Sequence, residues 1–389
     1  MLSAINENRW VKVIKKKPYY AWLRSLFPNY KTTYIDDRGH FDYGEEIILD
    51  WPAGVPKPRV AVIQDLEPYP RWTKYLHFLE INGFPHALYN IHSHDWLEKA
   101  RDFDVFLGLI GSDLGILQET RKKYFFLEQY LGKICYPSTA EIMLYEDKSL
   151  EAYLAAITGI PLAKTYISND QQDALAMIET FSYPVVSKFE TGSGSVGVTL
   201  VRNKKQAEKI VRQAFSTRGR MTHRLYQREK DYCYFQEFIP NDGYDIRCIL
   251  VDNKVFGYSR KTLAGDFRAS GMNQVVWGAL PEKAILTAWR ANKVLKSPIL
   301  VMDMVHGLDD TYTVIEYSIN CQIDTPEQLI VDGVPGMYII GEDESIRFQP
   351  GRVWIHDLAL REFFLKNYLP RCLQVLAPQP ELFAQPQLP

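Results

Sequence analysis

Residues 183–201 read YPVVSKFETGSGSVGVTLV, and this stretch decides the fold. An apolar run ends in Lys188, a glycine- and serine-rich loop follows, and a second, β-branched run closes the stretch. The loop matches G-x-G-x-x-G, which indicates a dinucleotide-binding fold only where a helix follows directly. Here the first helical pattern begins at residue 204, after the second apolar run. We therefore predict a strand–loop–strand hairpin.

The loop of this hairpin allows two interpretations. Glycines let the backbone approach a ligand closely, and consecutive N–H groups in such a loop form a concave anion site. In this interpretation the loop is a phosphate-binding flap, and Lys188 adds a cation. In the other, the loop is an ordinary glycine-rich turn, and the lysine is incidental. The stretch alone does not decide between them.

The composition is that of a globular protein with two or three domains. The chain has 389 residues, of which 46% are hydrophobic and 24% charged, with a formal net charge of -2. This balance gives no case for binding nucleic acid, and the apolar runs fall short of the ~18 residues of a membrane span. The five cysteines form no C-x-x-C pair. They favour reduced thiols in a cytoplasmic protein over a structural zinc site.

The pattern along the chain predicts four segments. The second alternates strands and helices, as in a small α/β layer with a parallel sheet, and includes one long helix over residues 114–136. The segments are an aromatic and basic N-terminal segment (1–58), the α/β domain (59–140), a larger domain divided near residue 240 (141–376), and a Pro/Gln-rich tail (377–389).

A second hairpin, VMDMVHGLDDTYTVIEYSIN, carries paired carboxylates at residues 301–320. A two-residue turn at Asp309-Asp310 sets Asp303 directly opposite Glu316. Two carboxylates that close repel each other unless a cation lies between them, and oxygen ligands favour magnesium or manganese. Asn320 continues the same face and adds a neutral oxygen. The alternative is a register shifted by one residue, with one carboxylate paired to a basic side chain.

Basic side chains accompany this acidic pair. Arg247 shares a strand face with Asp245, two residues before it. Singly, each basic residue reads as a surface or salt-bridged side chain. Clustered, they would neutralise a polyphosphate or an acyl phosphate as it forms. The set comprises Lys148, Lys188, Arg247, Arg260, Lys261 and Arg268.

Between residues 142 and 320 these motifs resemble the ATP-grasp superfamily, and its RimK-type (ribosomal-protein glutamate ligase) branch in particular. Each motif is weak alone, and the ordered set is specific. The resemblance implies an ATP-grasp fold with α+β subdomains, preceded by a small α/β pre-ATP-grasp domain. The motifs are, in order, Asp147-Lys148 before a helix and Gly159-Ile-Pro161, Pro184-Val-Val-Ser-Lys188, the glycine loop, Gln236-Glu-Phe-Ile239, Asp245-Ile-Arg247, Gly265-Asp-Phe-Arg268, and Asp303 with Glu316.

The resemblance also implies roles for individual residues. Arg268, with Arg247, is expected to stabilise the reaction intermediates. Asp303, Glu316 and Asn320 are expected to bind magnesium, or manganese in its place. The family's E-x-N motif reads Glu316-Tyr-Ser-Ile-Asn320 here, so either Ser318 or Asn320 is the third metal ligand. In a second departure, Ser270 stands where the branch has an asparagine. The residues expected to bind ATP are Lys148, Lys188, Gly192, Ser193, Gly194, Ser195, Gly197, Gln236, Glu237, Phe238, Ile239 and Asp245.

The implied activity is ATP-dependent joining of a carboxylate to an amine through an acyl phosphate, with release of ADP and phosphate. The substrates implied are small molecules, peptides or sugars, with no nucleic acid and no membrane span. A homodimer is left open. Two alternatives are a kinase that phosphorylates a small-molecule hydroxyl and a non-catalytic ATP-binding regulatory protein. The presence of both lysines and both metal carboxylates disfavours the last alternative.

Overall fold

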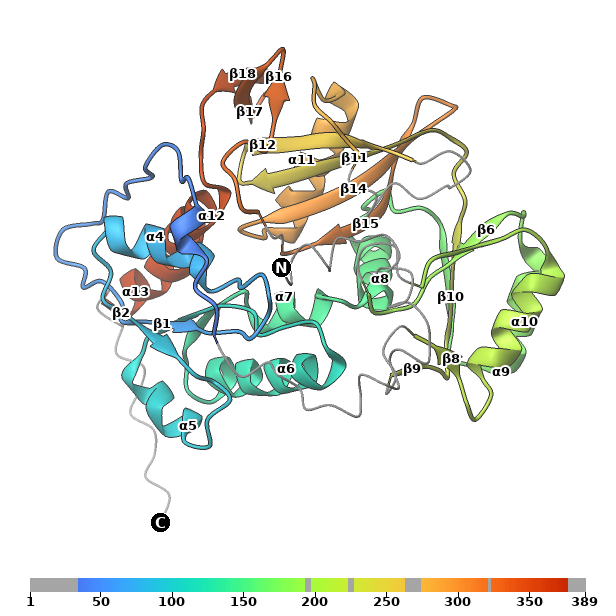
Figure 1. The fold of residues 1–389 in the computed structure, drawn as a ribbon, viewed down its shortest axis with the longest axis horizontal. Helices are drawn as coiled ribbons and strands as arrows, with labels where there is room; N and C mark the ends of the chain where they lie inside the picture. Colours follow the sequence, from blue (N-terminus) through green and yellow to red (C-terminus); the bar gives the residue numbers. More distant parts are fainter. Residues whose placement is uncertain (1–33, 193–196, 223–226, 263–273, 321–322, 377–389) are drawn as a thin grey trace, which may run out of the picture.

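The chain folds around three main sheets, which form an N-terminal unit, a middle unit and a large C-terminal sheet (Figure 1). The computed structural model describes residues 34–192, 197–222, 227–262, 274–320 and 323–376. Most of the aromatic and basic N-terminal segment and all of the Pro/Gln-rich tail lie outside this range.

The N-terminal unit is the predicted α/β layer with a parallel sheet. Its strands run in the order β2-β1-β3-β4, and all three pairings are parallel. β1 reads VAVI and is buried along its whole length, as expected for a parallel strand covered on both faces. The elements are η1 (Arg38–His40), β1 (Val60–Ile63), α4 (Thr73–Ile81), β2 (His86–Tyr89), α5 (Trp96–Lys99), η2 (Ala100–Asp102), β3 (Val105–Leu107), α6 (Leu114–Gln129) and β4 (Ile134–Tyr136).

The long helix predicted over residues 114–136 is wrong. Helix α6 ends at Gln129, and residues 134–136 form strand β4, which pairs in parallel with β3. Gly132 lies between them with φ +62°, a left-handed conformation that ends helices. The apolar side chains of Ile-Cys-Tyr continue the helical pattern by chance, but they fill the sheet core instead.

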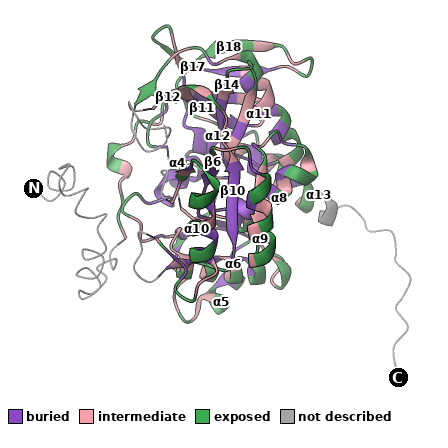
Figure 2. Cartoon of the chain, turned by 90° about the vertical axis from the view of Figure 1, so that its right-hand side faces the viewer, coloured by how far each residue is buried: buried purple, intermediate pink, exposed green. Residues whose placement is uncertain are grey.

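The middle unit contains the hairpin of residues 183–201 as predicted. β6 pairs antiparallel with β7, with Val185 opposite Val201, and the sheet order is β5-β10-β6-β7. The unit has its own hydrophobic core, and β10 is buried behind α9 and α10 (Figure 2). The elements are α7 (Thr139–Leu144), α8 (Lys148–Thr158), β5 (Thr165–Ser168), α9 (Gln171–Met177), η3 (Ile178–Thr180), β6 (Val185–Ser187), β7 (Thr199–Val201), α10 (Lys204–Ala214), β8 (Arg220–Met221), β9 (Arg228–Glu229) and β10 (Cys233–Glu237).

The large sheet is antiparallel, in the order β15-β14-β11-β12-β17-β16. A two-residue turn at Asp252-Asn253 joins β11 to β12, since Val251 pairs with Lys254. The sequence did not reveal the strands after residue 330. The elements are β11 (Asn241–Val251), β12 (Lys254–Lys261), β13 (Val275–Val276), α11 (Glu282–Leu295), β14 (Leu300–Gly307), β15 (Tyr312–Ser318), β16 (Ile330–Val331), β17 (Val334–Ile340) and β18 (Ile346–Pro350).

The end of the described chain returns to the N-terminal unit, where α12 (Ile355–Phe363), the π-helical turn η4 (Phe364–Tyr368) and α13 (Leu369–Leu376) lie beside α4 (Figure 1). The ring of Phe364 stacks on that of Phe84, with 4.4 Å between centroids. One hydrophobic core therefore runs from the N-terminal sheet into the large sheet. Within the described ranges, every helix is too short or too polar to cross a bilayer.

Candidate active site

Lys148 is the first residue of α8 and is almost fully buried. Asp147 caps the helix by accepting a hydrogen bond from the Leu150 amide at 3.0 Å, which fixes where the lysine side chain starts. Its Nζ donates to the carbonyl oxygen of Gly192 at 2.8 Å and lies 3.3 Å from Oε1 of Glu316. Burial alone lowers the pKa of Lys148, but the charge of Glu316 and of neighbouring glutamates outweighs it, and the pKa is raised.

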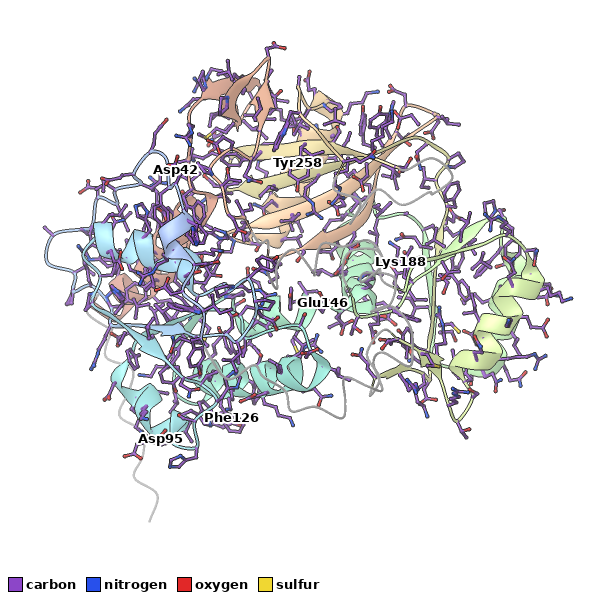
Figure 3. The ribbon with its side chains drawn as sticks, viewed as in Figure 1. Asp42, Asp95, Phe126, Glu146, Lys188 and Tyr258 are labelled. Atoms are coloured by element: carbon purple, nitrogen blue, oxygen red, sulfur yellow. The ribbon has the colours of Figure 1, made fainter. Side chains whose placement is uncertain are left out.

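Lys188 follows strand β6 and is buried to the same degree. Its Nζ donates to the backbone carbonyl of Ile315 at 2.8 Å. Burial is the main cause that lowers its pKa to about 8, and the nearby charge of Lys148 adds to the shift. Among the described residues, no carboxylate lies at hydrogen-bonding distance from Lys188. Glu316 is nevertheless close enough for its charge to raise the pKa of Lys188 and so oppose part of the shift. The two lysines, predicted from separate motifs, are close enough for their charges to interact, and both are affected by the charge of Glu316. Figure 3 shows Lys188 next to α8, the helix that begins at Lys148.

Glu151 is a third buried charge at this place, and sequence reasoning missed it. It lies three residues after Lys148 on α8, so the two side chains share a helix face. Burial raises the pKa of Glu151 well above its ordinary range, and the charge of Glu316 raises it further. A glutamate in the first turn of a helix is common for its effect on the helix dipole, so the sequence position gave no warning of a buried site residue.

Asp303 on β14 lies opposite Glu316 on β15, as predicted, but not through the predicted turn. His306 pairs with Tyr312, so the turn holds one residue more than the two expected. The register then shifts between Asp303 and Met304, where Ile315 is bulged out, and the shift restores the pairing of the two carboxylates. The same bulge carries the Ile315 carbonyl that accepts from Lys188.

Four charged side chains on β11, β12 and β14 form a closed group, here called the arginine cluster. Arg247 donates from Nε and Nη2 to the two oxygens of Asp303, at 2.8 and 2.7 Å. Arg260 donates to both oxygens of Asp245, at 2.6 and 2.8 Å, and its Nη2 lies 2.9 Å from Oδ2 of Asp303. Asp303 is buried, which alone raises its pKa, but the two guanidinium groups hold that pKa well below its usual range.

Asp245, expected to contact ribose, has both carboxylate oxygens occupied by Arg260. Burial is the largest cause that raises its pKa to about 6, and the charge of Asp303 contributes in the same direction. The expected roles of Asp245, Arg247 and Asp303 stay predictions. Asp303 is paired with a basic side chain, Arg247, as the alternative interpretation of the hairpin expected. It also lies opposite Glu316, as the metal-site interpretation expected.

The segment expected to bind adenine leads from β10 towards β11. Gln236 is buried, and its Nε2 donates to Oγ1 of Thr165 at 3.2 Å. Glu237 accepts a hydrogen bond from the hydroxyl of Tyr166 at 3.1 Å, and its backbone N–H donates to the carbonyl of Lys164. The segment continues through Phe238 and Ile239, whose carbonyl accepts from Asn241. These contacts fix the chain where the middle unit joins the large sheet.

Both described ends of the glycine loop are anchored. The Gly192 amide donates to Oε2 of Glu146 at 2.6 Å while its carbonyl accepts from Lys148. Gly197 has φ +75°, and a Cβ there would lie 2.0 Å from the ring of Phe189, so glycine is required for two reasons. Four predicted site residues lie outside the described residues, namely Ser193, Gly194, Ser195 and Arg268.

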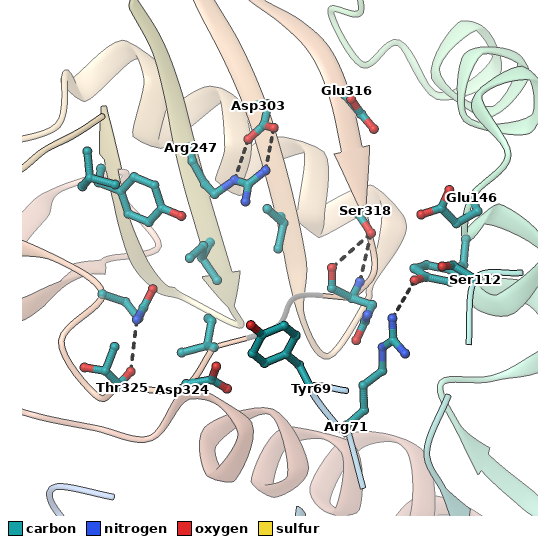
Figure 4. A pocket seen from close by; sticks show the side chains of 18 of the residues that line it. Tyr69, Arg71, Ser112, Glu146, Arg247, Asp303, Glu316, Ser318, Asp324 and Thr325 are labelled. Carbon is teal, nitrogen blue, oxygen red and sulfur yellow. Dashed lines mark hydrogen bonds and ion pairs between the residues drawn. The ribbon is translucent and has the colours of Figure 1, made fainter. Parts of the chain in front are cut away.

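A cavity of about 690 Å³, a volume typical of small-molecule sites, is lined by part of these groups (Figure 4). Lys188, Asp245 and the segment expected to bind adenine are not among its lining residues. Its walls come from the N-terminal unit, from α8 and from the large sheet. Among the described residues, no group of three or more His, Cys, Asp and Glu side chains could hold a metal ion. The lining includes Arg71, Tyr145, Lys148, Arg247, Asp303, Glu316, Ser318 and Asn320.

Comparison with known proteins agrees with this geometry. Residues 145–331 match the family model of a RimK-like ATP-grasp domain. A probable alpha-L-glutamate ligase of Klebsiella pneumoniae is 30% identical over 214 residues, covering 53% of this chain and 65% of the relative. A ribosomal protein bS6–L-glutamate ligase of Escherichia fergusonii is 30% identical over 174 residues, covering 44% and 53%. The chain thus spans about half to two thirds of the length of these relatives.

A solved structure shares the fold over a larger part of the chain. The structure of the D-cycloserine synthetase DcsG superposes with a TM-score of 0.53 at 15% identity, and covers 78% of this chain and 99% of the other. At this identity the likeness concerns the fold alone. The predicted ATP-grasp fold with a preceding α/β unit is confirmed.

Proposed function

Because the chain contains a RimK-like ATP-grasp domain, we propose that the protein is an ATP-dependent ligase that joins a carboxylate to an amine. One observation carries the proposal. Lys148 and Lys188 come from different elements, are both buried, and both act on Glu316, which pairs in register with Asp303. Buried ammonium groups that converge in this way fit the negative charge of a triphosphate.

In this proposal the two lysines bind phosphate oxygens of ATP. A substrate carboxylate oxygen bonds to the γ-phosphorus as the bond to the ADP oxygen breaks. The amine nitrogen then bonds to the acyl carbon, the bond to phosphate oxygen breaks, and phosphate leaves with the electron pair. The proton lost by the amine passes to the departing phosphate. The protein contributes position, charge neutralisation and exclusion of water, and no protein nucleophile is required.

The side chains that line the cavity fit a magnesium ion in part. Glu316 and Asn320 offer the oxygen ligands that magnesium prefers. Asp303 shares its oxygens with two guanidinium groups, so it serves as a ligand only when Arg247 releases one of them. When bound, the ion would neutralise charge on the phosphate oxygens. Manganese takes the same ligands.

Two further features belong to the proposal. The name of the Escherichia fergusonii relative supports a protein or peptide as one substrate. Cys135, Cys233, Cys248 and Cys372 are all free thiols, which supports a cytoplasmic location, where ATP is supplied.

The test supplies ATP and magnesium with a pool of peptides as carboxylates and a pool of amino acids as amines. The expected result is ADP and phosphate only when both pools are present, together with a product heavier by one amino acid residue. Lys188→Met is expected to abolish turnover, whereas Lys204→Met removes an exposed lysine and is expected to preserve it. A product phosphorylated on a hydroxyl group and formed from one pool alone would contradict the ligase proposal and support the kinase alternative.

A further inference from the structure

The backbone of Arg71 is held in a fixed place by the loop between β1 and α4. The carboxylate of Asp65, which is fully buried, accepts backbone N–H groups from Glu67, Arg71 and Trp72, at 3.0, 2.7 and 3.3 Å. Three bonds to one carboxylate close the loop and direct the Arg71 side chain towards the cavity (Figure 4). The loop therefore fixes the backbone from which the Arg71 side chain starts.

The guanidinium of Arg71 is buried without enough partners. The residue is 7% exposed, and its Nη2 donates to the hydroxyl of Tyr145 at 3.1 Å. Its Nε and Nη1 are buried and have no hydrogen-bond partner among the described residues. An unsatisfied buried donor is costly, and more so when it carries charge. In native structures such a group has a specific reason, such as a bound water or ion or a role at a functional site.

Arg71 differs in this respect from the other cations of the cavity. Arg247 is bonded to Asp303 through two nitrogens, and Lys148 lies against Glu316. Within the described ranges, no carboxylate lies at salt-bridge distance from Arg71. A planar guanidinium with open donors matches the two oxygens of a carboxylate.

Building on the proposed ligase activity, we propose that Arg71 binds the unreactive carboxylate of the amine substrate, so that this substrate is an α-amino acid. Nε and Nη1 are covered by protein, so the carboxylate reaches them after a change of the Arg71 rotamer. The amino group would then face the rest of the cavity, whose lining includes Glu316 and Asn320.

The reacting carboxylate is a poorer occupant of this site. It loses its charge when it becomes an acyl phosphate, so a paired guanidinium would hold the ground state more tightly than the intermediate. It also has to approach the phosphate groups, which the proposal places at Lys148 and Lys188. A carboxylate that stays anionic throughout the reaction is therefore the better match for Arg71.

The test measures binding apart from turnover. Each proteinogenic amino acid and its α-carboxamide is titrated calorimetrically into the full-length protein with ADP and magnesium. At least one amino acid is expected to bind the wild type at least about 100-fold more tightly than its amide. In Arg71→Gln that ratio is expected to fall below about 3-fold, because the variant lacks the guanidinium group that distinguishes the acid from the amide. Arg71→Lys, which keeps the charge without the planar fork, is expected to give an intermediate ratio.

Two controls accompany these titrations. ADP affinity, measured for each variant, shows that the protein is folded. Arg290→Gln removes an exposed arginine paired with Glu344 and is expected to keep the wild-type ratio. If Arg71→Gln does not fold, Arg71→Lys decides the matter by the same ratio.

The outcomes separate this inference from the ligase proposal. Equal binding of acid and amide by the wild type, an unchanged ratio in folded Arg71 variants, or no binding of any amino acid would overturn the role of Arg71, whether or not ATP-dependent ligation occurs. Carboxylate-selective binding that depends on Arg71, without ligation of any pool, would support the site and reject the ligase.

Discussion

Two charge clusters in this protein have the same formal composition and opposite organisation. The arginine cluster contains two carboxylates and two guanidinium groups, and each carboxylate is bonded through both oxygens. A second group, here called the lysine cluster, contains two carboxylates and two ammonium groups, namely Lys148, Glu151, Lys188 and Glu316. Its contacts include the Lys148–Glu316 pair at 3.3 Å, while Lys188 donates to a backbone carbonyl instead.

The difference follows from the shapes of the cations. A guanidinium group offers parallel donors that satisfy both oxygens of a carboxylate, whereas an ammonium group is a point charge on a flexible stem. The lysine cluster is therefore incompletely paired, and burial shifts the pKa of Lys188 down and that of Glu151 up. The comparison teaches that, among the described residues, the arginine cluster satisfies its own charges, whereas Lys188 in the lysine cluster has no carboxylate at hydrogen-bonding distance, as the proposed binding of a triphosphate requires.

The largest predicted effect comes from breaking the arginine cluster. Asp303→Asn removes the charge that compensates Arg247 and Arg260 in a buried place. We expect the free energy of unfolding to fall by about 3–5 kcal/mol, as measured by urea denaturation without nucleotide. Asp310→Asn, at an exposed residue paired with Lys283, should cost less than about 1 kcal/mol. A similar small loss for both variants would contradict the view that the cluster depends on each of its charges.

A smaller and pH-dependent effect is predicted for the lysine cluster. The pKa of Lys188 is lowered from 10.5 to about 8, so between these values the unfolded chain binds a proton that the folded protein has released. Stability then rises with pH across this window, by about 1.4 kcal/mol for each pH unit. Relative to Lys188→Met, the wild type should therefore gain up to about 3 kcal/mol as the pH is raised through the window.

Nucleotide sharpens this test. An added phosphate group near Lys188 raises its pKa, so saturating ADP should diminish the pH-dependent gain. Lys204→Met, at an exposed lysine paired with Glu179, controls for the loss of a positive charge elsewhere. A gain that does not respond to ADP would mean that Lys188 does not meet the phosphates.

The sequence predicted the parts of this comparison that depend on short-range patterns. Lys148 follows a capping aspartate at the start of a helix, and Lys188 ends an apolar strand, so both could be placed before the fold was known. The pairing of Asp303 with Glu316 was also correct, although it results from two compensating differences. The turn is one residue longer than expected, and the bulge at Ile315 restores the register.

Long-range partners were beyond the reach of these patterns. Nothing near Arg247 in the sequence shows that its guanidinium is occupied by Asp303, 56 residues away. Arg71 was overlooked for the same reason, because its burial depends on a loop closed by Asp65 and on Tyr145 from a later segment. The strand at residues 134–136 was lost because its apolar side chains continue a helical period, and only Gly132 marks the break.

The smallest predicted effect tests Glu151 by the same carboxylate-to-amide change that is severe at Asp303. Burial raises the pKa of Glu151 above its ordinary value of 4.5, so this carboxyl group lowers the free energy of unfolding of the wild type as the pH rises. A glutamine at this position has no such effect. Near pH 4.5, Glu151→Gln should match the wild type within about 1 kcal/mol in urea denaturation, and it should gain on the wild type at higher pH. A loss comparable to that of Asp303→Asn would show that Glu151 is a bonded member of a closed cluster, and the two clusters would then no longer differ in kind.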